Sequence, residues 1–235
     1  MPSNSHLTRA DYDHYLVYLY FGSDPDLVNA CINRAYRDFN RTLHGFGNLK
    51  SGAETYHQAV ESLKDSLDRL KNIPASQIST ELFDGWHKTT CNQLTSLFKH
   101  QGHHLFIGQA QKWVNMTMKY IFTLGEERVP GFGASYTCCH APLDNILLKR
   151  LGKYGFPLLN CAWSRLDCYD EYLEKQNWIR QKFSIAPMDV EFLLWLGEEI
   201  EPGKIRRNFK SSLSTIGELK LSPVKKGENG VAESP

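Results

Sequence analysis

Apolar residues recur along most of the chain at intervals of three or four positions, the spacing that brings them onto one face of an α-helix. The clearest example follows Ser51, where Tyr56, Val60, Leu63 and Leu67 form one stripe. No segment shows the persuasive apolar and polar alternation of a strand, and no internal repeat is evident. Start and stop signals place the expected helices at about residues 8–21, 26–43, 51–70, 81–98, 106–124, 142–151, 163–183 and 187–199. We therefore expect an all-α protein, an irregular bundle of seven to eight helices.

Two of these helices begin with the sequence pattern of a capping box, in which paired side chains satisfy the free backbone N–H groups of the first turn. Thr8 is followed three positions later by Asp11, and Ser51 is followed at the same distance by Glu54. The pattern predicts a side-chain cap at both helix starts.

The segment 106–124 carries bulky apolar residues on nearly every side, which is typical of a helix surrounded by other helices. We expect this helix at the centre of the bundle. Its polar side chains then need hydrogen-bond partners. They either form structural hydrogen bonds within the core or line a pocket. They are Gln109, Gln111, Lys112, Asn115 and Lys119.

Composition and charge divide the chain into two parts. Apolar residues make up 41% and charged residues 23%, which is typical of a globular protein. From residue 204 onward the chain has seven Lys or Arg and three Glu, which leaves 20 basic and 23 acidic residues before it. We predict a single helical domain over residues 1–202 and a disordered basic tail over 203–235.

Several classes of protein are not indicated. No apolar run approaches the length that spans a bilayer, and the first residues lack a signal-peptide pattern, so we expect a cytoplasmic protein without a membrane segment. Walker-type phosphate loops, dinucleotide-binding glycine motifs and hydrolase elbows are also missing from the sequence. We expect no cofactor.

The most suggestive group of polar residues is Arg34, Arg37, Arg41 and His44, within the second expected helix. At 100° per residue these side chains fall within an arc of about 80°, opposite the apolar side of the helix. Guanidinium groups bind phosphates with two hydrogen bonds, and an imidazole exchanges protons near neutral pH. We predict nucleic-acid binding by Arg34, Arg41 and Lys112.

Residues 37–44, RDFNRTLH, resemble the motif of HEPN ribonucleases, in which an arginine precedes a histidine by four to six intervening residues. Members of that family are helical bundles, often dimers, that cleave RNA without a metal ion. The resemblance implies that Arg37 stabilises charge on the phosphate and that His44 acts on the ribose hydroxyl or the leaving oxygen. It also implies RNA or another polyanion as partner, with a homodimer as an option.

Interpretations without catalysis stay open for the same residues. The basic side of the helix either is simply solvated or binds an anion without catalysis. The second functional hypothesis is a non-enzymatic module whose helical faces bind a protein partner, with the tail as a tether. RNA cleavage in EDTA separates the two hypotheses, because only the ribonuclease depends on His44.

Two further clusters contain chemistry-bearing residue types. His100, His103 and His104 with Cys138, Cys139 and His140 have none of the spacings of a known zinc site, so we expect no metal. His140 and Asp144, four residues apart, form a conceivable acid and base pair. Capping of the next helix is the simpler role for Asp144.

Overall fold

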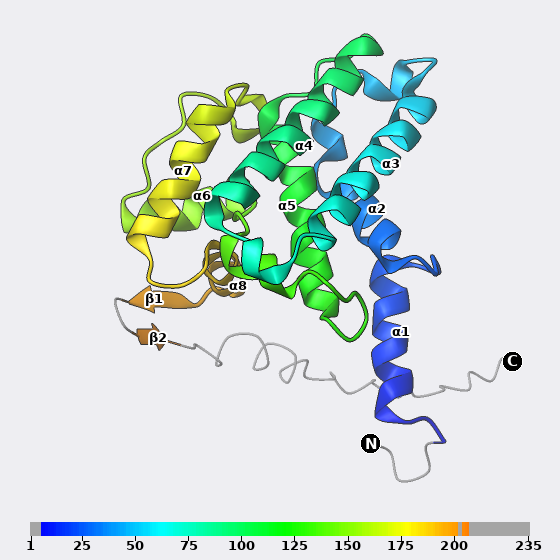
Figure 1. The fold of residues 1–235 in the computed structure, drawn as a ribbon. Coiled ribbons are helices and arrows are strands. Elements are labelled where there is room, and N and C mark those ends of the chain that lie inside the picture. Colours follow the sequence, from blue (N-terminus) through cyan, green and yellow to red (C-terminus); the bar gives the residue numbers. More distant parts are fainter. Residues whose placement is uncertain (1–5, 202–203, 207–235) are drawn as a thin grey trace, which may run out of the picture.

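The computed structural model describes residues 6–201 and 204–206. Within these residues the chain folds into eight α-helices, which confirms the predicted all-α irregular bundle (Figure 1). The helices are α1 (Arg9–Phe21), α2 (Leu27–Phe39), α3 (Gly52–Lys71), α4 (Thr80–His100), α5 (Ile107–Leu124), α6 (Asn145–Leu151), α7 (Tyr169–Lys182) and α8 (Pro187–Leu196). Short 3-10 turns lie between them: η1 (Asn40–Thr42), η2 (Phe46–Asn48), η3 (Ala75–Gln77), η4 (Gly133–Cys138), η5 (Gly152–Tyr154) and η6 (Trp163–Arg165).

A short hairpin follows the last helix. Helix α8 ends where Gly197 adopts a left-handed conformation, with a φ of 85°. Strand β1 (Glu199–Glu201) then pairs antiparallel with β2 (Lys204–Arg206), and Ile200 lies opposite Ile205. The sequence prediction assigned Lys204–Arg206 to the tail and foresaw no strand. The rest of the predicted tail, from residue 207, lies outside the described residues.

Helix α5 lies at the centre of the bundle, as its apolar pattern predicted (Figure 1). Trp113, Val114 and Met118 are fully buried, and α2 and α4 pack against the helix on different sides. Its first turn also touches the segment around η6 through Gly108. A β-carbon at Gly108 would lie 1.7 Å from the carbonyl oxygen of Trp163, so only glycine permits this approach.

Helix α2 ends four residues earlier than the sequence suggested. After Phe39 the chain tightens into η1, where the Thr42 hydroxyl donates to the Phe39 carbonyl at 2.7 Å. The Gln109 side chain of α5 donates to the Thr42 carbonyl at 2.9 Å, and the turn buries Leu43 in the core. Arg41 therefore lies in a 3-10 turn and His44 beyond it, so the expected continuous stripe is not formed.

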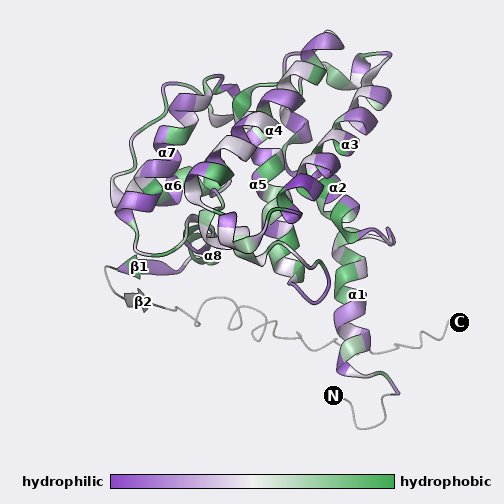
Figure 2. Cartoon of the chain, viewed as in Figure 1, coloured by the Kyte–Doolittle hydropathy of each residue, from purple (hydrophilic) through white to green (hydrophobic). Residues whose placement is uncertain are grey.

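Helix α1 projects from the body of the molecule (Figure 1). None of its residues is buried, and its N-terminus carries the predicted capping box of Thr8 and Asp11. Only its last part contacts the body, where the rings of Tyr20 and Phe21 pack edge-on against Tyr120 of α5. Apolar residues along this projecting helix are visible in Figure 2. No helix in the described part of the chain combines the length and apolar character needed to cross a bilayer.

Candidate functional site

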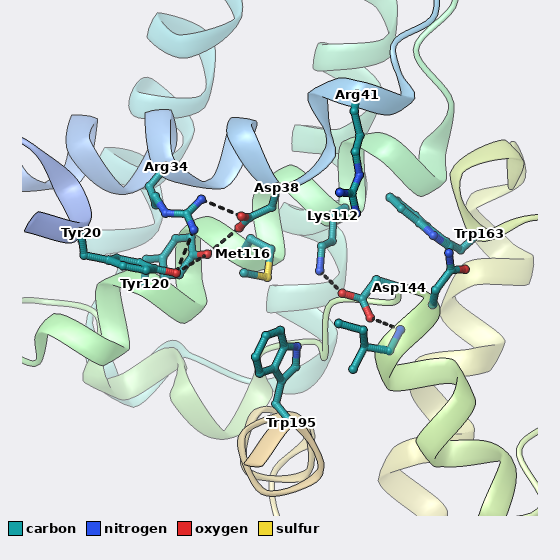
Figure 3. Close-up of a pocket in the computed structure, with 12 residues that line it drawn as sticks. Tyr20, Arg34, Asp38, Arg41, Lys112, Met116, Tyr120, Asp144, Trp163 and Trp195 are labelled. Atoms are coloured by element: carbon teal, nitrogen blue, oxygen red, sulfur yellow. Dashed lines mark hydrogen bonds and ion pairs between the residues drawn. The ribbon is translucent and has the colours of Figure 1, made fainter. Parts of the chain in front are cut away.

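A pocket of about 210 Å³ lies between the side of α5 and six neighbouring elements (Figure 3). Its walls come from the end of α1, from α2 and η1, from the start of α6, from η6 and from the end of α8. Cationic, acidic and aromatic side chains share this small volume. The lining residues are Tyr20, Arg34, Asp38, Arg41, Lys112, Met116, Tyr120, Asp144, Asn145, Ile146, Trp163 and Trp195.

Arg34 is held in place by Asp38 and Tyr20 at one end of the pocket. Its Nη1 donates to Asp38 Oδ1 at 2.7 Å, one helical turn further along α2, and its Nη2 donates to the Tyr20 hydroxyl at 3.1 Å. The guanidinium carbon also lies 4.5 Å from the centre of the Tyr20 ring. Partial burial by itself lowers the pKa of Arg34. The nearby Tyr120 and Asp38 raise the pKa by more than burial lowers it, so the net shift is upward.

A chain of hydrogen bonds continues from this ion pair. The Tyr120 hydroxyl donates to Asp38 Oδ2, and the Tyr20 hydroxyl donates to the Tyr120 oxygen at 3.1 Å. Burial and the bond to Asp38 raise the pKa of Tyr120 well above its ordinary value. The Tyr120 phenol therefore stays neutral and donates to Asp38, and the same carboxylate fixes Arg34 through its other oxygen.

Lys112 forms the second ion pair of the pocket. Its Nζ lies 2.5 Å from Asp144 Oδ2, and the lysine side chain is only 4% exposed. The other oxygen of Asp144 accepts from the backbone N–H groups of Ile146 and Leu147, so the same carboxylate caps α6. The cap fixes the position of Asp144, and Asp144 fixes that of Lys112.

Arg41 differs from the other two cations. It lies on η1, its side chain is exposed, and it reaches toward the pocket above Lys112 (Figure 3). Among the described residues no carboxylate pairs with it and no side-chain hydrogen bond holds it. The lining residues comprise three cations and two carboxylates. Arg41 is therefore the charge that the pocket leaves uncompensated.

Two tryptophans provide flat apolar walls. Trp163 is 8% exposed and stands on η6, while Trp195, on α8, is 47% exposed. Trp195 is supported from the core by Lys119, whose Nζ lies 5.2 Å from the ring centre. Lys119 in turn pairs with the fully buried Glu191 at 2.7 Å. The wall is thus attached to the central helix through a buried ion pair.

The structure brings together the three residues predicted to bind nucleic acid, Arg34, Arg41 and Lys112, because all three line this pocket. The predicted catalytic pair is not among the lining residues. Arg37 and His44 are both exposed, with Arg37 beside Tyr56. Because α2 ends at Phe39, Arg41 lies in η1 and His44 beyond it, so these two residues do not continue the helical line of Arg34 and Arg37.

Asp38, Tyr20, Tyr120 and Trp195 were missed by sequence reasoning. Asp38 lies inside the arginine-rich segment itself, four residues after Arg34, which is the spacing of an ion pair within a helix. That spacing was an available signal. The two tyrosines and Trp195 carry no such local signal, because their contacts join segments far apart in the chain.

The predicted pair of His140 and Asp144 does not form. His140 Nε2 lies 2.7 Å from Asp84 Oδ1, and its Nδ1 lies 2.8 Å from the Tyr172 hydroxyl. Asp144 instead caps α6, which was the simpler prediction. Cys138 and Cys139 are buried thiols, and no group of metal-ligating side chains occurs in the described part of the chain.

His140 belongs to a buried polar network between α4, α5 and α7, which we call the histidine network. It continues from Tyr172 to Asn115 Nδ2 at 2.8 Å and from Asn115 Oδ1 to His87 Nε2 at 3.0 Å. At the surface end Arg180 donates to both oxygens of Asp84 at 2.7 and 2.9 Å. The members are Asp84, His87, Gln111, Asn115, His140, Tyr169, Tyr172 and Arg180.

The chain matches no family model, no curated protein and no solved structure. The interpretation of the pocket therefore depends on its own geometry and charge.

Proposed function

We propose that the protein binds single-stranded RNA and that the pocket holds one nucleotide of it. The observation that carries the proposal is the unpaired Arg41 above a pocket whose other cations, Arg34 and Lys112, already have carboxylate partners. An unpaired guanidinium is free to donate two parallel hydrogen bonds to a phosphate. A phosphodiester carries one negative charge, which matches the one uncompensated charge.

The remaining lining fits the other parts of a nucleotide. Trp195 and Trp163 present ring surfaces, and bases of any sequence stack on such surfaces. Asp38, Asp144 and Asn145 contribute carboxylate acceptors and a side-chain amide to the same pocket. Carboxylates in the lining disfavour a bare polyphosphate. They favour a ligand that combines one phosphate with polar base and ribose groups.

The first test compares two arginine variants by fluorescence anisotropy with a labelled single-stranded RNA oligonucleotide. We expect Arg41→Gln to weaken binding at least about tenfold, because a charge-assisted hydrogen bond contributes about 1.5 to 3 kcal/mol. Arg37→Gln is the matched control: it removes the same charge from a neighbouring exposed position outside the pocket, and we expect less than a twofold change. Equal effects of the two variants would overturn the proposal.

Salt titration supplies a second measure. For single-stranded RNA with one to three phosphates in contact, affinity should fall about 3- to 20-fold between 50 and 200 mM salt. The Arg41→Gln variant should show a shallower slope. A salt-insensitive association would favour the alternative of a protein-interaction module.

Cleavage of the RNA stays a prediction of the HEPN resemblance, and the proposal does not require it. Its test is incubation of the labelled RNA with protein in EDTA. Loss of cleavage in His44→Ala, with RNA affinity unchanged, supports a role for His44 in the chemistry. Intact RNA with the wild-type protein would leave binding as the function.

A further inference from the structure

Helix α1 carries five of the ten large hydrophobic side chains that are exposed in the described part of the chain. Tyr15, Leu16, Tyr18, Leu19 and Tyr20 are each between 46% and 60% exposed. Over the rest of the described residues, the large apolar side chains exposed beyond a third are scattered: Leu7, Ile146, Leu158, Trp195 and Leu196. Single exposed apolar residues are ordinary, but a contiguous group marks an interface.

The exposed residues occupy one side of α1. At 100° per residue they span an arc of about 200° centred near Leu19, whereas Val17 and Phe21 point to the opposite side. Val17 and Phe21 are the residues of this helix that pack against the core. The helix thus uses a narrow side for its own body and leaves a wide apolar side in solvent.

A helix of this length does not stand alone in water. α1 has 13 residues, and isolated helices of about 12 to 15 residues are marginal even with favourable sequences. Only its C-terminal half packs on the body, through Val17, Tyr20 and Phe21. Its capping box stabilises the first turn but supplies no packing for the middle. The middle of the helix therefore needs a partner surface.

We infer that the partner is α1 of a second copy of this chain, which lies antiparallel against the Tyr15, Leu16 and Leu19 side. These residues repeat at the three- and four-residue spacing of a two-helix seam, and an identical helix offers the complementary stripe. The antiparallel arrangement also opposes the two helix dipoles and keeps the two bodies at opposite ends.

The available area agrees with a pair of helices. If a fully exposed Tyr or Leu presents about 200 Å², Tyr15, Leu16 and Leu19 offer roughly 350 Å² per copy, somewhat under half of the ~800 Å² per partner in a stable complex. The bodies beside each helix end would contribute the remainder. Tyr20 also lines the pocket, so pairing of α1 fixes one wall of the candidate site. The inference does not depend on RNA binding.

The test is sedimentation equilibrium of the full chain in a reducing buffer. We expect a mass of twice the 26.9 kDa of the chain at micromolar concentration. Leu19→Glu places a charge in both halves of the seam and should raise the dissociation constant at least about 100-fold. Leu158→Glu is the matched control, because Leu158 is 90% exposed and lies in the segment between η5 and η6; this variant should stay dimeric.

A cysteine variant tests the geometry. In a two-fold pair the residue near the axis meets its own copy, so Leu16→Cys should form an intermolecular disulfide on mild oxidation, whereas Leu158→Cys should not. A monomer up to 100 μM overturns the inference, whether α1 is then covered by the tail or binds anionic phosphatidylserine vesicles. A dimer that survives Leu19→Glu overturns it as well, because a different face would hold it.

Discussion

The histidine network and the pocket both gather charged side chains next to α5, yet they differ in how completely those charges are paired. In the network, Asp84 accepts from Arg180 and His140, and His140 reaches Tyr172 with its other nitrogen. In the pocket, Arg41 has no such partner among the described residues. Fully paired buried groups stabilise one arrangement, whereas an unpaired cation at an opening is available to a ligand.

The comparison separates two roles that the sequence does not distinguish. Histidine, arginine and aspartate occur in both regions, so residue type alone does not locate a site. Burial and hydrogen bonding distinguish the two regions. His140 is fully buried with both ring nitrogens in hydrogen bonds, whereas Arg41 is exposed. We expect substitutions in the network to change stability and substitutions in the pocket to change affinity.

The largest expected effect comes from Asp84→Ala. The variant leaves Arg180 and His140 without their carboxylate in a largely buried place, and the free energy of unfolding should fall by about 3 to 5 kcal/mol. Urea denaturation measures the loss. Asp170→Ala is the control, since its ion pair with Lys88 is exposed and should contribute less than about 1 kcal/mol. Equal losses in both variants would contradict the structural role of the network.

A smaller effect is expected from pH. Burial lowers the pKa of His140 to about 4, although its bond to Asp84 partly opposes the shift, and burial also lowers the pKa of His87. In the unfolded chain both imidazoles take up protons near pH 6.5. The unfolded state therefore binds more protons below pH 6.5, and stability falls as pH falls toward 4.

For His140 alone this linkage gives a loss of about 2 kcal/mol between pH 7 and pH 5. Urea denaturation at several pH values measures it. His140→Gln starts from lower stability but should lose less of it on acidification, while the exposed His57→Gln should keep the wild-type slope. An unchanged slope in His140→Gln would show that His140 is not the titrating group.

The smallest effect concerns the pocket wall. Trp195→Ala removes a half-exposed ring and should weaken RNA binding by about 1 kcal/mol, or about fivefold, at nearly unchanged stability. Anisotropy measures the affinity. Leu196→Ala, one residue further and 72% exposed, lies outside the pocket lining and serves as the control. Identical affinities of the two variants would argue against stacking on Trp195.

Local signals predicted the helices well. The Thr8 and Asp11 box forms as expected, and the unbroken apolar character of 106–124 placed α5 correctly at the centre. The Ser51 pattern misled, because α3 begins there without a side-chain cap. The sequence pattern therefore allows a side-chain cap but does not require one. Here η2 comes shortly before the helix, and Gly52 lies close to the Phe46 carbonyl.

The site was predicted only in part. Arg34, Arg41 and Lys112 were named from their charge, but their meeting in one pocket depends on the packing of α2 against α5, and the end of α2 at Phe39 was not foreseen. Nothing in the segment Asn40-Arg41-Thr42 forbids a helix; the turn is set by Gln109, 67 positions away from Thr42. Contacts of that range, like the one between His140 and Asp84, follow from the packing of whole helices and leave no local pattern.

Gly108 has a consequence for how the pocket can change. Backbone meets backbone where α5 touches η6, so the distance between the floor of the pocket and the Trp163 wall is set without any side chain in between. Side chains that line the pocket can be substituted without changing this contact between the two backbones. A methyl group at Gly108 would overlap the Trp163 carbonyl, so Gly108→Ala requires the backbone that carries the Trp163 wall to shift.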